Sequence, residues 1–382
     1  MKRVAILGST GSIGKNALRV INNLGNEFTP IALSCYRDVN LLAQQALQFR
    51  PHVVDLVNQE NLSLLKEKLK GTGIKILSGK EGLCEIAEME KVDLVLNGIM
   101  GSAGFLPTLA AIRKGKRVAL ANKETLVSYG QIIMDEARKN KAEIIPVDSE
   151  HSAIFQCIKG RENSEIRKII LTSSGGPFRN RKNLRDVTIE ETLNHPVWSM
   201  GKKISVDSAT MMNKALEIIE AHFLFDIPVE NISVVIHPQC IIHSAVEFID
   251  SSIIAQLSIP DMTLPIQYAL TFPERKHSIT KSLDLTEIST LTFEPATPSR
   301  FPALSLAYRA LEKGGTTTAV LNSSNESLVA AFLNHKVSLD KITKIIRFII
   351  DKYSPIENPS VEEVQSAEEW GKKEAEQYVK TI

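Results

Sequence analysis

Short apolar runs alternate with amphipathic stretches through the first 147 residues of the chain. The helical patterns between the runs include Leu41–Phe49 and Thr108–Lys114. This alternation predicts a mostly parallel sheet covered by helices. From their length and composition, we predict buried strands at Arg3–Leu7, Pro30–Leu33, Val53–Leu56, Leu94–Leu96, Arg117–Leu120 and Glu143–Val147.

The pattern changes after Asp148. Four apolar runs predict a separate, mainly antiparallel sheet: Lys168–Thr172, Ile232–His237, Ala245–Ile249 and Ile253–Ser258. Residues 276–302 show few helix signals and several prolines, which is typical of an extended connection. Four helical patterns follow and predict a small bundle: Ala303–Lys313, Ser324–Asn334, Leu339–Tyr353 and Val361–Lys380.

The fold class expected from these patterns is α/β, with three folded parts. An N-terminal Rossmann-like domain spans 1–147, and a central α+β domain spans 148–275. The extended connection 276–302 leads to a C-terminal helical domain at 303–382.

Charge and cysteine content narrow the class of protein. The 45 basic and 44 acidic residues give a net charge of +1, so we expect no nucleic-acid or membrane partner. The four cysteines stand singly, as reduced thiols do. The N-terminus begins with a strand pattern, and no apolar run approaches the ~18 residues of a membrane helix. We therefore expect a soluble, cytoplasmic globular protein.

A glycine-rich turn, G-S-T-G-S-I-G, follows the first predicted strand and opens a helix. Gly8, Gly11 and Gly14 would let the backbone turn tightly and approach a pyrophosphate at the helix N-terminus. A tight turn that binds no ligand is the alternative. In its context the motif predicts a dinucleotide site.

The end of the second strand bears on which dinucleotide is bound. NAD-binding folds usually place an acidic residue there to hold the ribose hydroxyls. This chain instead has Arg37, whose cation suits a 2′-phosphate, so NADP is favoured. Asp38 weakens that interpretation, and a solvated loop charge is the alternative for Arg37.

Two more segments follow strands and should lie at the carboxyl edge of the sheet, where ligands of such folds bind: Asn97–Gly104 and Ala121–Thr125. Asn122, Lys123 and Glu124 could therefore face the nicotinamide half of the cofactor. The alternative is that Asn122 caps a helix while Lys123 and Glu124 form salt bridges.

Two carboxylates follow the last strand of the first domain, in P-V-D-S-E-H. In an extended chain Asp148 and Glu150 would project to one side, with Ser149 on the other. Close carboxylates are suitable ligands for Mg²⁺ or Mn²⁺. An ordinary helix N-terminus with Asp, Ser and Glu as caps is the alternative.

A second polar cluster lies in the stretch Ile204–Phe223. Asp207 or Ser208 is expected to cap a helix there. On that helix Asn213, Lys214 and Glu217 would share one face and could offer an acid to a metal and two donors to an anion. A surface salt bridge is the alternative.

Two loops and a pair of histidines complete the candidates. L-T-S-S-G-G-P-F, from Leu171, suits phosphate held by backbone N–H groups and hydroxyls, although a plain turn would explain it too. The loop near 194–203 carries Trp198 and could be a lid, or the indole could anchor it to the domain. His237 and His243 are expected to be packing or hydrogen-bonded groups, and Asn322–Glu326 a helix cap.

Together these motifs resemble one family, the 1-deoxy-D-xylulose 5-phosphate reductoisomerases. The matching pieces occur in family order and cover essentially the whole chain: G-S-T-G-S-I-G, L-A-N-K-E-T-L-V, P-V-D-S-E-H-S-A-I-F-Q, S-S-G-G-P-F, H-P-V-W-S-M-G, K-I-S-V-D-S-A-T-M-M-N-K-A-L-E and I-H-P-Q-C-I-I-H-S. The resemblance implies an NADPH- and metal-dependent enzyme of non-mevalonate isoprenoid biosynthesis. Its substrate would be a phosphorylated sugar-like molecule, 1-deoxy-D-xylulose 5-phosphate, which is rearranged and reduced to 2-C-methyl-D-erythritol 4-phosphate. The resemblance also implies that 1–147 is the dinucleotide-binding domain and that the central domain is catalytic and forms a homodimer.

The resemblance assigns roles residue by residue. It implies metal ligands at Asp148, Glu150 and Glu217, and catalytic contacts at Lys123, Glu150, His195 and Lys214. The implied substrate contacts are Ser149, Glu150, Ser174, His195, Trp198, Ser208, Asn213, Lys214 and Glu217, with Met200 on the closing loop and His243 as a support. The implied cofactor contacts are Gly8, Thr10, Gly11, Ser12, Ile13, Arg37, Asn122, Glu124 and Gly201.

The sequence departs from the family pattern in a few positions, and two rival functions stay open. Where the family more often has Ala-Gly-x-Asn, this chain reads Cys35-Tyr36-Arg37-Asp38, and Ser173 replaces a usual glycine. The rivals are another NADP-linked dehydrogenase without rearrangement and a dinucleotide-sensing regulator. The sequence favours neither Mg²⁺ nor Mn²⁺, and neither a retro-aldol nor a ketol-shift route.

Overall fold

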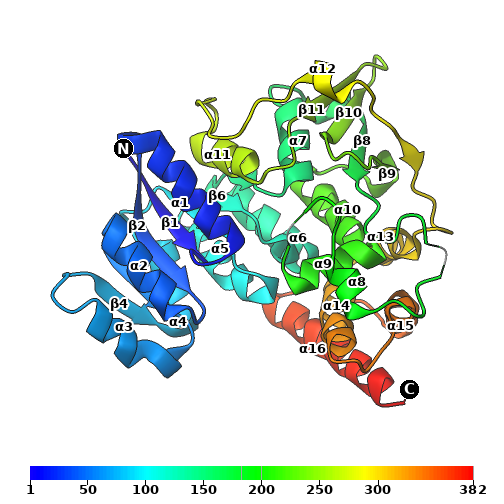
Figure 1. Cartoon of the computed structure of the whole chain (residues 1–382). Coiled ribbons are helices and arrows are strands. Elements are labelled where there is room, and N and C mark those ends of the chain that lie inside the picture. Colours follow the sequence, from blue (N-terminus) through cyan, green and yellow to red (C-terminus); the bar gives the residue numbers. More distant parts are fainter. Residues whose placement is uncertain (182, 199, 382) are drawn as a thin grey trace. The chain divides into compact units, whose positions relative to one another are not determined.

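The structure is a computed structural model that describes residues 1–181, 183–198 and 200–381. Ser199, in the expected lid, therefore lies outside the described residues. Contacts group the chain into two compact units. Unit 1 comprises Met1–Thr125, Ile133–Ser152 and Asp261–Lys281, and unit 2 comprises Leu126–Ile132, Ala153–Pro260 and Ser282–Ile382. The four-part division expected from the sequence stays a prediction. Figure 1 labels the elements of both units.

Unit 1 contains a seven-stranded sheet in which every paired neighbour is parallel. Its order is β4-β3-β2-β1-β5-β6-β7. The strands are β1 (Lys2–Leu7), β2 (Phe28–Cys35), β3 (Val53–Leu56), β4 (Lys75–Ser78), β5 (Leu94–Asn97), β6 (Arg117–Leu120) and β7 (Ile144–Pro146). After β4 the chain crosses to the other side of β1, so the order reverses between β1 and β5. Dinucleotides bind Rossmann-type sheets at this reversal.

Helices connect these parallel strands, as parallel pairing requires. They are α1 (Ser12–Leu24), α2 (Val39–Phe49), α3 (Leu62–Lys68), α4 (Gly79–Glu88), α5 (Phe105–Arg113) and α6 (Lys123–Asn140), whereas α7 (Ser149–Cys157) follows the last of these strands. A late segment, α11 (Thr263–Thr271), also belongs to this unit and contacts α1, β6 and β7. Eight of its nine residues are buried.

Unit 2 contains a five-stranded mixed sheet with the order β11-β10-β8-β9-β12. Its strands are β8 (Ile166–Ser173), β9 (Ile232–Ile236), β10 (Ile242–Phe248), β11 (Ile253–Leu257) and β12 (Glu294–Pro295). Among the described strands of this sheet, the β8–β9 pair alone is parallel. The expected mainly antiparallel sheet is therefore confirmed, and β12 adds a short edge strand from the connection 276–302.

The helices of unit 2 share one hydrophobic core with this sheet. They are α8 (Ile189–Leu193), α9 (Lys202–Thr210), α10 (Met212–Phe225), α13 (Pro302–Lys313), α14 (Thr317–Leu333), α15 (Leu339–Lys352) and α16 (Val361–Thr381), whereas the described residues of the short helix α12 (Leu285–Ile288) are not part of this core. Core residues come from the sheet, from α9 and α10, and from the last four helices, which confirms the helical C-terminal region. Among the described residues, no helix is both long and apolar enough to cross a membrane.

Three expectations about helix ends are wrong. Asp207 and Ser208 do not cap a helix but lie inside α9, which ends at Met211 with a left-handed φ of 62° before α10 begins. Asn322–Glu326 lies within α14 rather than at its start. Ser149 already begins α7, so Asp148 and Glu150 do not share an extended strand.

Candidate active site

The glycine turn lies where the sheet order reverses. It follows β1 and leads into α1, whose N-cap is Gly11. The Gly8 N–H donates to Ser34 Oγ at 3.1 Å, and the buried Gln45 side chain bonds Ser9 through both its oxygen and its nitrogen. These bonds connect the turn to β2 and α2, two neighbours along the chain. Nothing in the sequence pattern indicated the role of Gln45.

The local backbone geometry requires glycine at two positions of this motif. Gly8 has a φ of 84°, which favours glycine. A Cβ on Gly14 would overlap Gly8 O and the Cα of Ser9. The first turn of α1 has no acidic residue and its N-cap makes no side-chain hydrogen bond, so its N–H groups suit an anion.

At the end of β2 the side chains of Tyr36 and Arg37 are exposed. The Asp38 carboxylate accepts a hydrogen bond from Leu41 N at 3.1 Å and caps α2. The acidic group is therefore engaged by its own helix.

Parallel pairing of β6 with β7 brings two polar segments to one edge of the sheet. Leu120 pairs with Pro146, so the residues that follow each strand lie close together. Lys123 Nζ is 2.8 Å from Asp148 Oδ2, and both side chains are largely buried. The cation partly compensates the negative charge of Asp148 and Glu150.

Asp148 and Glu150 have further bonds around the start of α7. Asp148 Oδ1 accepts from Ser149 N at 2.9 Å, and Ser149 Oγ donates to Glu150 Oε2 at 2.5 Å. Asn122 caps α6 by accepting from Thr125 N at 3.0 Å, while its Nδ2 donates to Ile99 O and Gly101 O. The Asn122 side chain is thus a helix cap, as the alternative held, so a cofactor contact would have to go through its backbone.

In unit 2, α10 carries the predicted polar face. Asn213 Nδ2 donates to Glu217 Oε1 at 2.5 Å, and Lys214 Nζ bonds Glu217 Oε2. The side chains of Lys214 and Glu217 are 3% and 1% exposed. A surface salt bridge is therefore excluded. Burying an ion pair costs desolvation energy, which favours a functional reason for it.

The S-S-G-G turn after β8 is preorganised by its own hydroxyls. Gly175 N donates to Ser173 Oγ at 3.2 Å and Gly176 N donates to Ser174 Oγ at 3.1 Å. A Cβ on Gly176, whose φ is 71°, would overlap Ser208 O. The turn is thus in contact with α9, so Ser174 and Ser208 come from adjoining segments.

His195 lies against this turn. Its Nδ1 accepts from the N–H groups of Val197 and Trp198 at 3.2 and 3.0 Å, so the neutral ring carries its proton on Nε2. Nε2 is 3.2 Å from Ser174 Oγ and donates to it. Burial lowers the pKa of His195, which favours this neutral form. Ser174 Oγ then accepts hydrogen bonds from His195 Nε2 and from Gly176 N. Its own hydroxyl proton is left to donate to a ligand.

The rest of the expected lid is only partly regular. Trp198 and Met200 are half-buried, and Gly201 is the exposed N-cap of α9. Lys202 and Lys203 already belong to that helix. The role of the loop near 194–203 as a lid stays a prediction.

The chain is similar to known proteins of one family over nearly its whole length. Three family models match it: 1-deoxy-D-xylulose 5-phosphate reductoisomerase over residues 4–130, its C-terminal domain over 144–225, and the DXP reductoisomerase C-terminal domain over 257–374. The chain belongs to the 1-deoxy-D-xylulose 5-phosphate reductoisomerase family.

Individual family members match over their full length. The reductoisomerase of Trichlorobacter lovleyi is 50% identical over 384 residues, covering 100% of this chain and 98% of that protein. The enzyme of Caldanaerobacter subterraneus subsp. tengcongensis is 50% identical over 371 residues, covering 96% of this chain and 97% of the relative.

Solved structures of the family share the fold. The Zymomonas mobilis reductoisomerase in complex with NADPH superposes with a TM-score of 0.94 at 42% identity and covers both chains completely. A DOX-P reductoisomerase with NADPH, fosmidomycin and magnesium has a TM-score of 0.94 at 40% identity, over 100% of this chain and 98% of that one. The predicted fold class is confirmed.

Proposed function

We propose that this chain catalyses the rearrangement and NADPH-dependent reduction of 1-deoxy-D-xylulose 5-phosphate to 2-C-methyl-D-erythritol 4-phosphate, in isoprenoid precursor biosynthesis. Family membership over the full length supports the reaction. The observation that carries it in the structure is the buried Lys214–Glu217 pair beside Asn213 on α10. A simple hydride-transfer enzyme has little use for such a pair.

The residues of unit 1 fit NADPH, which supplies the hydride when it is bound. The N–H groups at the start of α1 suit the pyrophosphate, and exposed Arg37 suits the 2′-phosphate. Close packing at Gly14 leaves the turn no room for a Cβ and keeps its backbone close to α1. The proposed contacts from unit 1 are Gly8, Thr10, Gly11, Ser12, Ile13, Arg37, Asn122 and Glu124, and Gly201 is proposed as a contact from unit 2.

The carboxylates fit a divalent metal by their donor chemistry, because Mg²⁺ and Mn²⁺ prefer carboxylate oxygens. We assign Asp148, Glu150 and Glu217 as its ligands. The metal supplies electrophilic polarisation of substrate oxygens when it is bound. Lys123 holds the Asp148 carboxylate in position through their 2.8 Å ion pair, and Ser149 orients Glu150.

The phosphate of the substrate is assigned to unit 2. Ser174 and Ser208 supply hydroxyls from adjoining segments, and Asn213 and Lys214 supply N–H donors. His195 fixes the direction of the Ser174 proton. Lys123 and Ser149 are assigned to the substrate's carbonyl and hydroxyl groups, and Trp198 and Met200 to a loop that excludes water.

The deciding experiment follows NADPH oxidation by absorbance with 1-deoxy-D-xylulose 5-phosphate, with and without Mg²⁺ or Mn²⁺. Glu150→Gln and Glu217→Gln are assayed beside the parent, and Mn²⁺ affinity is measured separately by calorimetry. We expect oxidation only with metal, and loss of both activity and Mn²⁺ affinity in each variant. Oxidation that ignores chelator would leave a dehydrogenase without rearrangement. Tight NADPH binding without turnover would favour a dinucleotide-sensing regulator.

We also propose a homodimer and a cytoplasmic location. β11 is an edge strand of the unit 2 sheet, and Ile253 and Ile254 on it are 58% and 40% exposed. Ile249, in the preceding turn, is 67% exposed. An apolar edge strand is a template for pairing with a second copy of the chain.

A further inference from the structure

The segment 291–300, which lies in the expected connection, is joined to the S-S-G-G turn through β9, His237 and Arg179. β12 within it pairs with β9 so that Glu294 is opposite Ile236. Ile236 in turn is opposite Ser173, the last residue of β8. Glu294 therefore lies in register with the residue from which the S-S-G-G turn begins.

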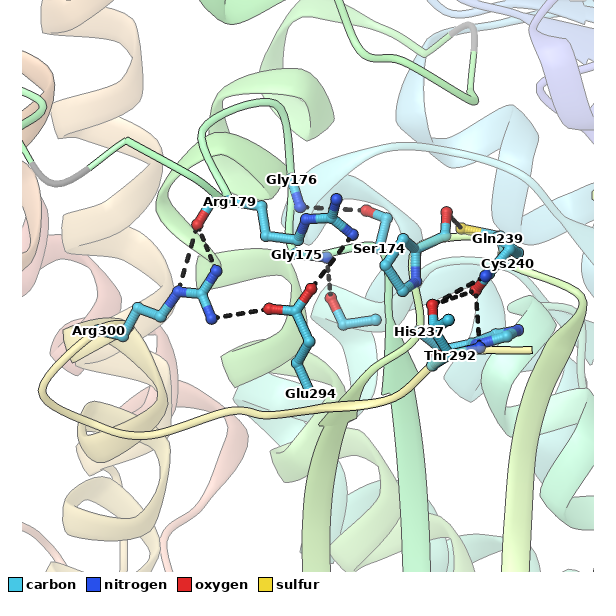
Figure 2. A network of polar contacts seen from close by, with 12 residues as sticks. Ser174, Gly175, Gly176, Arg179, His237, Gln239, Cys240, Thr292, Glu294 and Arg300 are labelled. Atoms are coloured by element: carbon cyan, nitrogen blue, oxygen red, sulfur yellow. Dashed lines mark hydrogen bonds and ion pairs between the residues drawn. The ribbon is translucent and has the colours of Figure 1, made fainter. Parts of the chain in front are cut away.

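One end of this segment is fixed to the turn through His237. Its Nδ1 donates to Thr292 O at 2.9 Å, and its ring stacks on Phe293 with centroids 5.0 Å apart. The backbone N–H of His237 donates to Ser173 O at 2.7 Å. Gln239 adds a bond to Thr292 Oγ1 at 2.8 Å. Figure 2 shows His237, Gln239 and Thr292 beside the turn.

The other end is fixed by an ion network (Figure 2). The Glu294 carboxylate lies between two guanidinium groups, 3.6 Å from Arg179 Nη1 and 2.9 Å from Arg300 Nη1. Arg300 also donates through Nε and Nη2 to Arg179 O, at 3.2 and 2.6 Å. Both the side chain and the backbone of Arg179 are therefore held by this segment.

Arg179 connects the network to the turn. A Cβ on Gly175, whose φ is 81°, would lie 2.9 Å from Cγ and Cδ of Arg179. The aliphatic part of Arg179 thus packs directly against the glycine that leads to Gly176 N, the donor to Ser174 Oγ. Movement of Arg179 would release the turn that orients the Ser174 hydroxyl.

We propose that Glu294 is a positioning residue that holds Arg179 against Gly175 and so keeps the Ser174–Gly176 turn in its anion-binding shape. The inference rests on the proposed function of this turn as the phosphate site. Glu294 is an acidic residue, which by charge alone would repel an anion. If Glu294 acts by positioning Arg179, its removal should weaken phosphate binding. If it acts only by repelling the anion, its removal should strengthen phosphate binding.

The test compares Glu294→Gln and Glu294→Asp with the parent, by steady-state kinetics and with inorganic phosphate as a competitive inhibitor. Positioning predicts that the phosphate Ki and the substrate KM rise about threefold to fivefold in both variants, while kcat and the KM for NADPH stay unchanged. The shorter Asp keeps the charge but cannot reach both guanidinium groups. Tighter phosphate binding by Glu294→Gln would show that Glu294 acts only by charge and would overturn the proposal.

Two further variants separate the possible failures. Glu247→Gln breaks a 3.1 Å ion pair with Arg167 on the same sheet, and it should leave the phosphate Ki unchanged. Ser174→Ala should raise that Ki if the turn binds phosphate. A raised Ki in Ser174→Ala with parental values in both Glu294 variants would refute positioning and leave the phosphate site standing. No change in Ser174→Ala would refute the phosphate site itself.

Discussion

Asp55 is a fully buried carboxylic acid on β3, and neither of its oxygens has a hydrogen-bond partner among the described residues. Its oxygen occupies the space that a Cβ on Gly82 of α4 would need. Burial, with the nearby charges of Glu81 and Glu85, raises the pKa of Asp55 to about 7. Because the unfolded chain releases this proton near pH 4, the folded state holds an extra proton between about pH 4 and 7. Stability should therefore fall as the pH rises through this range.

Asp55→Asn should remove this pH dependence. The variant should be more stable than the parent by about 1–3 kcal/mol at pH 8, where Asp55 is a buried charge, and nearly equal to it at pH 5. Urea unfolding at the two pH values measures the difference. Asp186→Asn, at an exposed position, is the matched control and should show no such trend. An equal effect of Asp55→Asn at both pH values would contradict the assignment.

Arg37 offers a second test at a single residue. If its guanidinium binds the 2′-phosphate, Arg37→Gln should raise the KM for NADPH about tenfold and leave the reaction with NADH unchanged. The ratio of kcat/KM for the two cofactors is the measurement. Arg50→Gln, at the exposed end of α2, serves as the control. An unaltered ratio in Arg37→Gln would remove Arg37 from the cofactor site.

Spacing along the sequence predicted some contacts between residues and missed others. Helical periodicity was sufficient to place Lys214 and Glu217 on one face, whereas the partner of Lys123, Asp148, was not predicted. The ion pair between Glu294 and Arg179 joins residues more than a hundred positions apart, and no local pattern marks it. Such contacts depend on the register of the sheet, which sequence alone does not reveal.

At the scale of elements, Gly11, the N-cap of α1, and Gly14, in its first turn, should behave differently when substituted. Gly14→Ala would overlap Gly8 O, so it should lower the melting temperature and weaken NADPH binding more than tenfold. A Cβ on Gly11 would lie 3.3 Å from Gly8 O, which the turn can nearly accommodate. Gly11→Ala should therefore keep its melting temperature and lose only cofactor affinity. Thermal melting and fluorescence titration with NADPH measure both; equal melting losses in the two variants would contradict this division.

Helices α9 and α14 show why the expected helix caps were wrong. Ser, Asp and Asn favour caps by local bonding, but in these helices they have tertiary partners. Asp207 accepts from Asn325 Nδ2 at 2.8 Å and pairs with Lys203 at 2.8 Å. Ser324 bonds Gly371 O on α16. From the sequence alone, Ser, Asp and Asn residues on a buried polar face of a helix cannot be distinguished from residues that cap a helix.

Asn325→Ala should test that polar face. Removal of the amide leaves the fully buried Asp207 carboxylate without this donor, at a cost of about 1–3 kcal/mol. Asn325→Asp, which has nearly the same shape, should cost more at neutral pH because it places a second carboxylate against Asp207. Urea midpoints give the comparison, and Ser327→Ala, which removes only a bond within α14, is the control. Parental midpoints for both Asn325 variants would show that the contact has no energetic role.

At the scale of the molecule, the alternation of strands and helices predicted the α/β class. This was possible because the segment that connects two parallel strands lies directly between them in the sequence. The return of α11 to unit 1, more than a hundred residues after β7, could not be predicted in this way. Nearly every residue of α11 is buried, so the hydrophobic pattern indicates burial without naming the partner. Long-range grouping therefore requires the structure.

The proposed homodimer is tested at this scale by the edge strand β11. Ile253→Lys puts a charge on the exposed apolar edge, where lysine opposes strand pairing between copies. We expect the parent to have the mass of a dimer by light scattering and the variant that of a monomer at micromolar concentration. Ile279→Lys, at a 40% exposed position in unit 1, should stay dimeric. A monomeric parent would refute the dimer, whereas a dimeric Ile253→Lys would move the interface away from β11.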